Sequence, residues 1–70
     1  RRSIREKLLC YFSMQQTQMG ESFMLPFSLS RLAEYISVDR SAMMRELKKM
    51  KEEKFVTVDH GRVTLMKTLY

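Results

Sequence analysis

Apolar residues recur at helical spacing in three stretches of the chain, and two β-rich runs follow near its C-terminal end. In the first stretch, over residues 1–18, one side of a helix carries Ile4, Leu8, Leu9, Tyr11 and Phe12. Ser3 lies at the N-cap position and Glu6 follows three residues later, which is the spacing of a capping box. Residues 15–18 are polar and poor candidates for burial, and Gly20 is expected to end this first helix.

The second and third stretches are separated by three residues, the length of the turn in a helix-turn-helix. The apolar face of the earlier helix consists of Leu29, Leu32, Ala33 and Ile36. Ser28 offers this helix an N-cap, and residues 37–39 form the turn. Asp39 is placed to accept hydrogen bonds from the first free N–H groups of the next helix, which is expected over residues 40–54. The side of that helix expected to face a core carries Met43, Leu47 and Met50.

The helical spacing of apolar residues stops after the third helix, and two short runs of β-forming residues follow. Residues 55–58 and 63–66 are expected to pair as a hairpin, and residues 59–62 form its turn with Gly61 available for a positive φ. A short extended piece is also expected at residues 23–25, because the proline that follows biases the chain toward extended geometry. The sequence therefore predicts a small α+β domain of three helices, a C-terminal β-hairpin and a short extra strand.

Composition and charge narrow the classes of protein that this chain can belong to. Seventy residues make a single domain with a small core, and 44% hydrophobic with 30% charged residues are globular proportions. A net charge of +5 favours a polyanionic partner. Cys10 is the only cysteine, which excludes an internal disulfide and makes a reducing cytoplasmic setting the simpler assumption. No apolar run reaches membrane-spanning length, so a membrane partner is not expected.

A short basic face lies beside the apolar side of the third helix. Its members are Arg40, Ser41, Met44, Arg45 and Lys48. By itself, a basic helix face is more often simply solvated, and His60 in a turn is more often an exposed loop residue than a metal ligand. Three features together raise the hypothesis of DNA binding: a three-residue turn, two early arginines in the helix that follows, and a hairpin with a basic tip.

Five segments spanning nearly the whole chain carry a family resemblance. They are I-R-E-K-L-L-C-Y-F at 4–12, L-P-F-S at 25–28, R-L-A-E-Y-I at 31–36, V-D-R-S-A-M-M-R-E-L-K-K-M-K at 38–51, and F-V at 55–56. These segments resemble the C-terminal DNA-binding domain of the bacterial Crp/Fnr family of transcription regulators. The resemblance implies a winged helix-turn-helix domain over residues 1–70, with the helix at residues 40–54 in the major groove of double-stranded DNA. It also implies that the chain is a fragment of a homodimeric cytoplasmic regulator, without the N-terminal effector domain and the dimerisation helix.

The resemblance further implies roles for particular residues. Contacts to bases are expected from Arg40, Ser41, Met44 and Arg45. Contacts to phosphates are expected from Ser28, Ser30, Lys48, His60, Gly61 and Arg62. An arginine can donate two hydrogen bonds to O6 and N7 of guanine, which makes Arg40 and Arg45 the main candidates for sequence recognition. Ser41 departs from the family, whose well-known members carry a glutamate there, and Ser37 departs from a turn that often carries glycine.

Two other classes of function come after transcription regulation by DNA binding: a protein–protein interaction module and, as a distant third, an enzyme. A winged helix can serve as a protein–protein interaction module, in which case the basic face is incidental. An enzyme is not expected, because the sequence offers no nucleophile with a base partner, no phosphate-binding glycine loop and no ligand cluster. No cofactor is expected in this fragment, since any effector would bind the absent domain and its identity is open. RNA polymerase is a further candidate partner.

Overall fold

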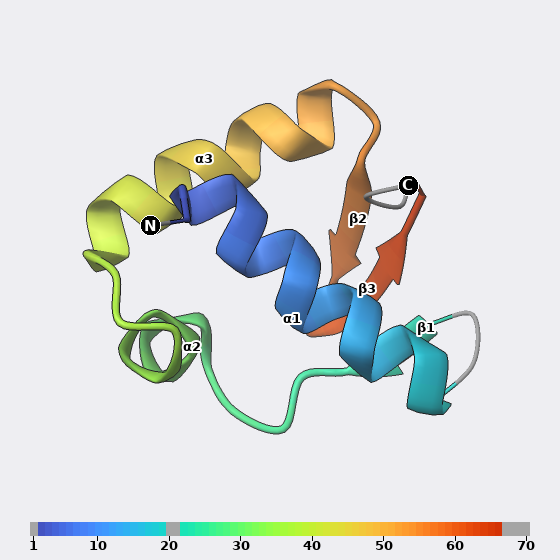
Figure 1. Ribbon diagram of the computed structural model, residues 1–70. Helices are drawn as coiled ribbons and strands as arrows, with labels where there is room; N and C mark the ends of the chain where they lie inside the picture. The colour runs from blue at the N-terminus through green and yellow to red at the C-terminus, as the bar shows by residue number, and fades with distance from the viewer. Residues whose placement is uncertain (1, 20–21, 67–70) are drawn as a thin grey trace.

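The computed structural model describes residues 2–19 and 22–66, and for residues 17–19 it describes only the backbone. Three helices and a three-stranded antiparallel sheet make up this part of the chain (Figure 1). In chain order they are α1 (Ile4–Met19), β1 (Ser22–Met24), α2 (Leu29–Tyr35), α3 (Arg40–Glu52), β2 (Val56–Asp59) and β3 (Arg62–Leu65). This α+β arrangement confirms the expected set of elements and is compatible with a winged helix. Within the described ranges, no helix has both the length and the apolar character needed to cross a membrane.

Local hydrogen bonds at the helix starts explain why each helix begins where it does. The Ser3 N–H donates to Glu6 Oε1 at 2.9 Å, and the Glu6 N–H donates to Ser3 Oγ at 3.1 Å, which confirms the capping box. Ser28 Oγ and Asp39 Oδ2 each accept a backbone N–H three residues further on, at 3.3 and 2.9 Å. Both predicted N-caps are therefore present. Gly20, which was expected to end α1, lies outside the described residues.

Two of the helices end on residues in the left-handed conformation, and neither of these residues is glycine. Ser37 after α2 has a φ of 62°, and Lys54 after α3 has a φ of 67°. Each end has the two backbone hydrogen bonds of a Schellman motif: Val38 N–H to Ala33 O, Ser37 N–H to Glu34 O, Phe55 N–H to Met50 O and Lys54 N–H to Lys51 O. The expectation that the third helix extends to Lys54 is therefore wrong, since the helix ends at Glu52 and the backbone turns at Lys54.

The sheet has β3 in the middle, with β1 on one side and β2 on the other. Val58 pairs with Val63 and Asp59 with Arg62, so only two residues remain in the hairpin turn. Both of them have a positive φ, 51° at His60 and 84° at Gly61, as a type I′ turn requires. The strands therefore lie one residue from their expected positions, at 56–59 and 62–65 instead of 55–58 and 63–66.

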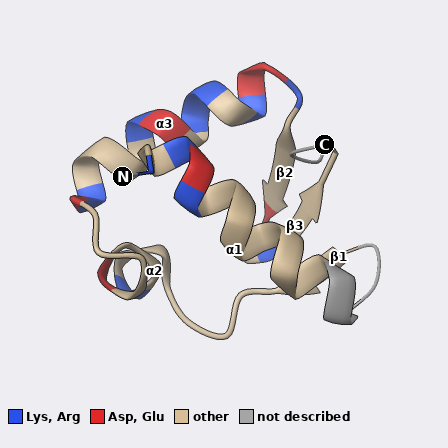
Figure 2. Ribbon diagram, in the orientation of Figure 1, with Lys and Arg blue, Asp and Glu red and all other residues tan. Residues whose placement is uncertain are grey.

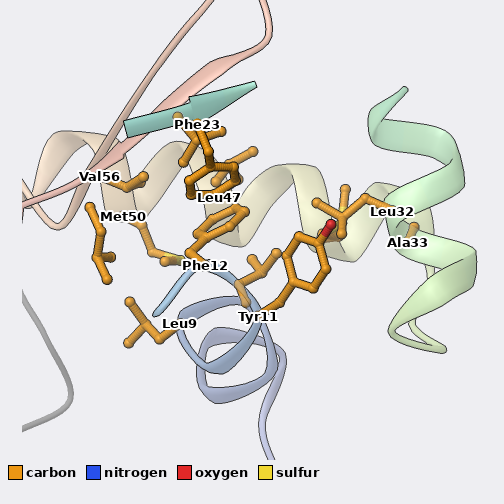
Figure 3. Close-up of a cluster of buried hydrophobic side chains, with 13 residues drawn as sticks. Leu9, Tyr11, Phe12, Phe23, Leu32, Ala33, Leu47, Met50 and Val56 are labelled. Carbon is orange, nitrogen blue, oxygen red and sulfur yellow. The ribbon is translucent and has the colours of Figure 1, made fainter. Parts of the chain in front are cut away.

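Within the part of the chain that the structure describes, thirteen buried hydrophobic side chains form a core to which each helix and each strand contributes (Figure 3). Phe12 of α1 lies near its centre, close to Leu47 of α3 and Phe23 of β1, and its ring centroid is 5.9 Å from that of Phe23. The predicted core side of α3 is confirmed, because Met43, Leu47 and Met50 are at most 1% exposed. α1 packs on α3, β1 and β3, so it ties the helix-turn-helix segment to the sheet.

The side chain of Gln16 links the C-terminal part of α1 to the sheet, which the sequence did not indicate. Gln16 Oε1 accepts the Leu65 N–H at 2.7 Å, and Gln16 Nε2 donates to the Leu65 carbonyl at 3.4 Å. The pairing of β1 with β3 covers residues 62–64, so Leu65 lies beyond it and Gln16 satisfies its backbone groups instead. Gln16 is half-buried in this role, although its polarity made it a poor candidate for burial.

Candidate nucleic-acid interface

α3 presents the predicted basic face to solvent along an unbroken helix. Arg40, Ser41, Arg45 and Lys48 are all exposed. Met44 differs from them, because it is half-buried and packs against the core. Charged residues concentrate on α3 and on the first turns of α1 (Figure 2). From Arg40 to Lys54, six basic and three acidic residues leave a local charge of +3, which is a large part of the charge of the whole chain.

Arg40 is held at the start of α3 by a contact with α2. Its Nε donates to Ser30 Oγ at 2.8 Å, and this contact is exposed to solvent. The structure thus brings together a residue expected to contact bases and one expected to contact phosphates. Ser28 lies two residues before Ser30 and uses its own hydroxyl oxygen to cap α2. One end of the helix pair therefore carries two hydroxyl groups, from Ser28 and Ser30, and the guanidinium group of Arg40.

The other predicted contact residues lie at the hairpin of β2 and β3, where His60 and Gly61 form the turn and Arg62 begins β3. His60 is 96% exposed, and its Nδ1 lies 2.9 Å from Asp59 Oδ1. The carbonyl of Gly61 accepts a backbone N–H that follows β1, at 2.9 Å. The Nη1 of Arg62 donates to Ser22 Oγ on the neighbouring strand β1, at 3.0 Å. These three residues form a second group, separate in the chain from the basic face of α3.

In the described part of the chain, no three His, Cys, Asp or Glu side chains come together as a metal site would require. No protein-family model matches this chain, and no curated protein matches it in sequence.

A polar network between α1 and α3 was not predicted from the sequence. Arg5 donates from Nη1 and Nη2 to the two carboxylate oxygens of Glu53, at 2.8 and 3.1 Å, and from Nε to Glu46 Oε2 at 2.5 Å. Hydrogen bonds to Glu53 and then Glu46 raise the pKa of Arg5 above its usual range. Arg5 Cζ also lies 5.2 Å from the ring centroid of Phe55, within cation–π distance. The one sequence signal is that Glu46 and Glu53 are seven residues apart and so share one flank of α3.

The surface between α1 and α2 carries three aromatic side chains in contact. The ring centroid of Tyr11 is 5.5 Å from that of Tyr35 and 6.4 Å from that of Phe27. Tyr35 is 68% exposed, and an open pocket beside it is also lined by Arg2, Lys7, Cys10 and Met14. Burial, and to a lesser extent the neighbouring Tyr35, raise the pKa of Tyr11. This surface combines exposed apolar area with two basic side chains.

Proposed function

We propose that this chain binds double-stranded DNA with sequence specificity, as a winged helix domain of a Crp/Fnr-type transcription regulator. The observation that carries the proposal is the exposure of Arg40 and Arg45 on one continuous helix whose opposite side is buried. The major groove of B-DNA is wide enough to admit an α-helix, and a helix anchored through its far side can present arginines there. The proposed contact helix is α3, which ends at Glu52.

The side chains of the proposed interface divide into two roles. Arg45 and Arg40 are suited to guanine, and the Arg40–Ser30 hydrogen bond limits the directions in which the Arg40 guanidinium can point. Ser41 is exposed and short, so it contacts a base only where the helix lies deep in the groove. Met44 offers only its exposed part to a thymine methyl group, because the rest packs on the core. Phosphate contacts are assigned to Lys48, Ser28, Ser30, the turn residues His60 and Gly61, and Arg62 at the start of β3.

The proposed biological unit is larger than this chain. A Crp/Fnr-type regulator binds a palindromic site as a homodimer in the cytoplasm, and its effector domain and dimerisation helix would lie outside residues 1–70. RNA polymerase would be a further partner of such a regulator. A single copy of this domain makes half of the contacts of a two-site complex, so we expect the isolated chain to bind DNA weakly and with strong salt dependence.

The proposal is tested by selecting a preferred duplex from a random pool and measuring binding by fluorescence anisotropy over a range of salt concentrations. Arg45→Ala is expected to cost about 1–3 kcal/mol on the selected duplex and to relax the preference at one base pair. Lys48→Ala is expected to weaken binding to all sequences alike and to reduce the salt slope by about 0.9. Lys7→Ala, which removes the same charge from α1, serves as the matched control and should leave the preference unchanged. If Arg45→Ala has no effect while Lys48→Ala alters the preference, the assigned roles are wrong.

The partly exposed apolar surface between α1 and α2 favours a second candidate function, a winged helix that contacts another protein. Tyr35 and Met14 are more than half exposed there, beside Arg2 and Lys7. Under this alternative, binding to duplex DNA is weak, shows no sequence preference, and is insensitive to Arg45→Ala. Selection from the random pool would then enrich no sequence, which distinguishes the two candidate functions.

A further inference from the structure

Polar side chains hold α3 on both flanks of its buried side. At about 100° per residue, Arg40 and Met44 lie on one flank, and Glu46 lies on the other, in line with the C-cap residue Glu53. The first flank contacts α2 through the Arg40–Ser30 hydrogen bond. The second flank contacts α1 through Arg5. Methionine and leucine side chains fill the space between, but apolar packing is not directional and fixes the rotation of a helix less sharply than hydrogen bonds do.

The contacts of Arg5 are specific in direction as well as charge. Its planar guanidinium donates two parallel hydrogen bonds to Glu53 and a third, from Nε, to Glu46. One group is therefore bound to Glu46 within α3 and to Glu53, the C-cap residue that directly follows the helix, about two turns apart. The side chains of Arg5 and Glu46 are only 27% and 23% exposed, so this flank is partly shielded from water, whereas Glu53 is 48% exposed. A lysine in place of Arg5 would keep the charge but could not form the planar fork.

The position of Glu46 connects this network to the proposed DNA contacts. Glu46 directly follows Arg45 in α3, so a rotation of the helix that lengthens the Arg5–Glu46 bond also moves Arg45. A helix with its side chains is about 10–12 Å across, so a rotation of about 10° moves a side-chain tip by about 1 Å. Hydrogen bonds to base edges tolerate only a few tenths of an ångström before they weaken. The orientation of α3 is thus sufficient to decide whether Arg45 can bond a base.

We propose that Arg5 is a positioning residue for DNA binding, which sets the rotation of α3 and thereby the orientation of Arg45 without contacting DNA itself. This inference rests on the proposed function. It gives α1 a role in sequence specificity through the guanidinium group of Arg5, which binds the carboxylates of Glu46 and Glu53.

The test compares Arg5→Lys and Arg5→Met with the unchanged chain, on the selected duplex and on the same duplex altered at the base pair that Arg45 contacts. Both variants are expected to lose about fivefold in affinity for the selected duplex, within the range of mutations that act through a neighbouring element. Affinity for the altered duplex should change little, so the specificity ratio falls by a similar factor. The salt slope should stay the same, because no phosphate contact is lost. Arg31→Lys is the matched control, since Arg31 and its partner Glu34 are both more than 70% exposed and 3.9 Å apart.

Several results would overturn the proposal. Unchanged affinity and specificity in both Arg5 variants would show that α3 does not need this network. A drop of about 0.9 in the salt slope of Arg5→Met, with Arg5→Lys unaffected, would make Arg5 a phosphate contact instead. A loss of folded protein lowers binding to both duplexes equally and leaves their ratio unchanged, so it is not mistaken for positioning. If an Arg5 variant fails to fold, Glu53→Gln weakens the fork while Arg5 is retained, and the specificity ratio is again expected to fall.

A separate measurement distinguishes failure of this inference from failure of the proposed function. If the unchanged chain shows no preference for any duplex, the proposed function is wrong. The amide resonances of α3 in nitrogen-15 spectra then report on positioning directly. Arg5→Lys should shift resonances along α3, including those near Arg45, by more than Arg31→Lys does. Unshifted resonances in Arg5→Lys would overturn the positioning role whatever the chain binds.

Discussion

Replacing Ser37 by glycine should stabilise the domain, although Ser37 lies in the turn that joins the two helices of the proposed binding unit. The residue is exposed, and its φ of 62° places it in the left-handed region, where a Cβ atom is unfavourable. The backbone hydrogen bonds that fix this conformation, from the N–H groups of Ser37 and Val38, are 3.1 and 3.0 Å long and do not involve its side chain. Glycine can adopt the same turn without the steric cost.

The expected gain follows from two opposing contributions. An L-residue in the left-handed conformation costs about 1–2 kcal/mol, which glycine avoids. Glycine in turn loses more backbone freedom on folding, which costs about 0.5–1 kcal/mol of stability. The difference between the two ranges is about 0–1.5 kcal/mol, and the free energy of unfolding should rise by about 0.75 kcal/mol, the difference between their midpoints. For a domain of this size, 1 kcal/mol corresponds to a Tm change of about 4–8 °C, so we expect Tm to increase by about 3–6 °C.

Urea and thermal unfolding followed by circular dichroism would measure this change. Ser37→Ala is the matched control, because alanine keeps the steric cost and should stay within about 0.5 kcal/mol of the unchanged chain. Lys54→Gly repeats the design at the end of α3, where φ is 67°, and its gain should add to that of Ser37→Gly. A loss of stability in Ser37→Gly, or an equal gain in Ser37→Ala, would refute the reasoning from backbone strain.

Two further predictions concern alkaline pH and the hairpin turn. The pKa of Tyr11 is raised in the folded state, so its contribution to stability is complete below the ordinary tyrosine pKa of about 10 and is lost as pH rises through the folded-state value. Urea unfolding at increasing alkaline pH should show this loss, and Tyr11→Phe should reduce it more than Tyr35→Phe does, because burial is the larger cause. Gly61→Ala should cost about 1–2 kcal/mol of unfolding free energy, because φ is 84° there and an added Cβ would lie 3.4 Å from Met24 Cε. Gly61→Asn should cost less, since asparagine tolerates the left-handed region, and equal losses in chemical denaturation would contradict this explanation.

Features of the fold that depend on residues close together in the sequence could be predicted from it. The caps at Ser3, Ser28 and Asp39 each involve a partner three residues away, so the spacing alone reveals them. The exposure of Arg40 and Arg45 was predictable for a similar reason, because the methionine and leucine side of α3 leaves them facing outward. The end of α3 was placed wrongly because lysine and glutamate favour helix, and no glycine marks the turn at Lys54.

Contacts between residues far apart in the sequence could not be predicted from the sequence. Arg5 is 41 residues from Glu46 and 48 from Glu53, and Gln16 is 49 residues from Leu65. Each of these polar side chains has several possible partners in the sequence, and only the packing of α1 across α3 and the sheet selects one. The contact of Arg40 with Ser30 depends in the same way on the angle between α2 and α3. DNA binding itself stays a prediction, which the variants of Arg45 and Lys48 would test.

The order of the strands has a consequence for how this chain is made. β3 is synthesised after β1 and β2, yet both of them pair with it, and its Val63 and Leu65 complete the core. While a nascent chain still lacks these residues, β1 and β2 have no strand between them, and their backbone edges stay open to other chains. The domain can therefore close only after Leu65 has left the ribosome, and a chain truncated before β3 should aggregate instead of folding.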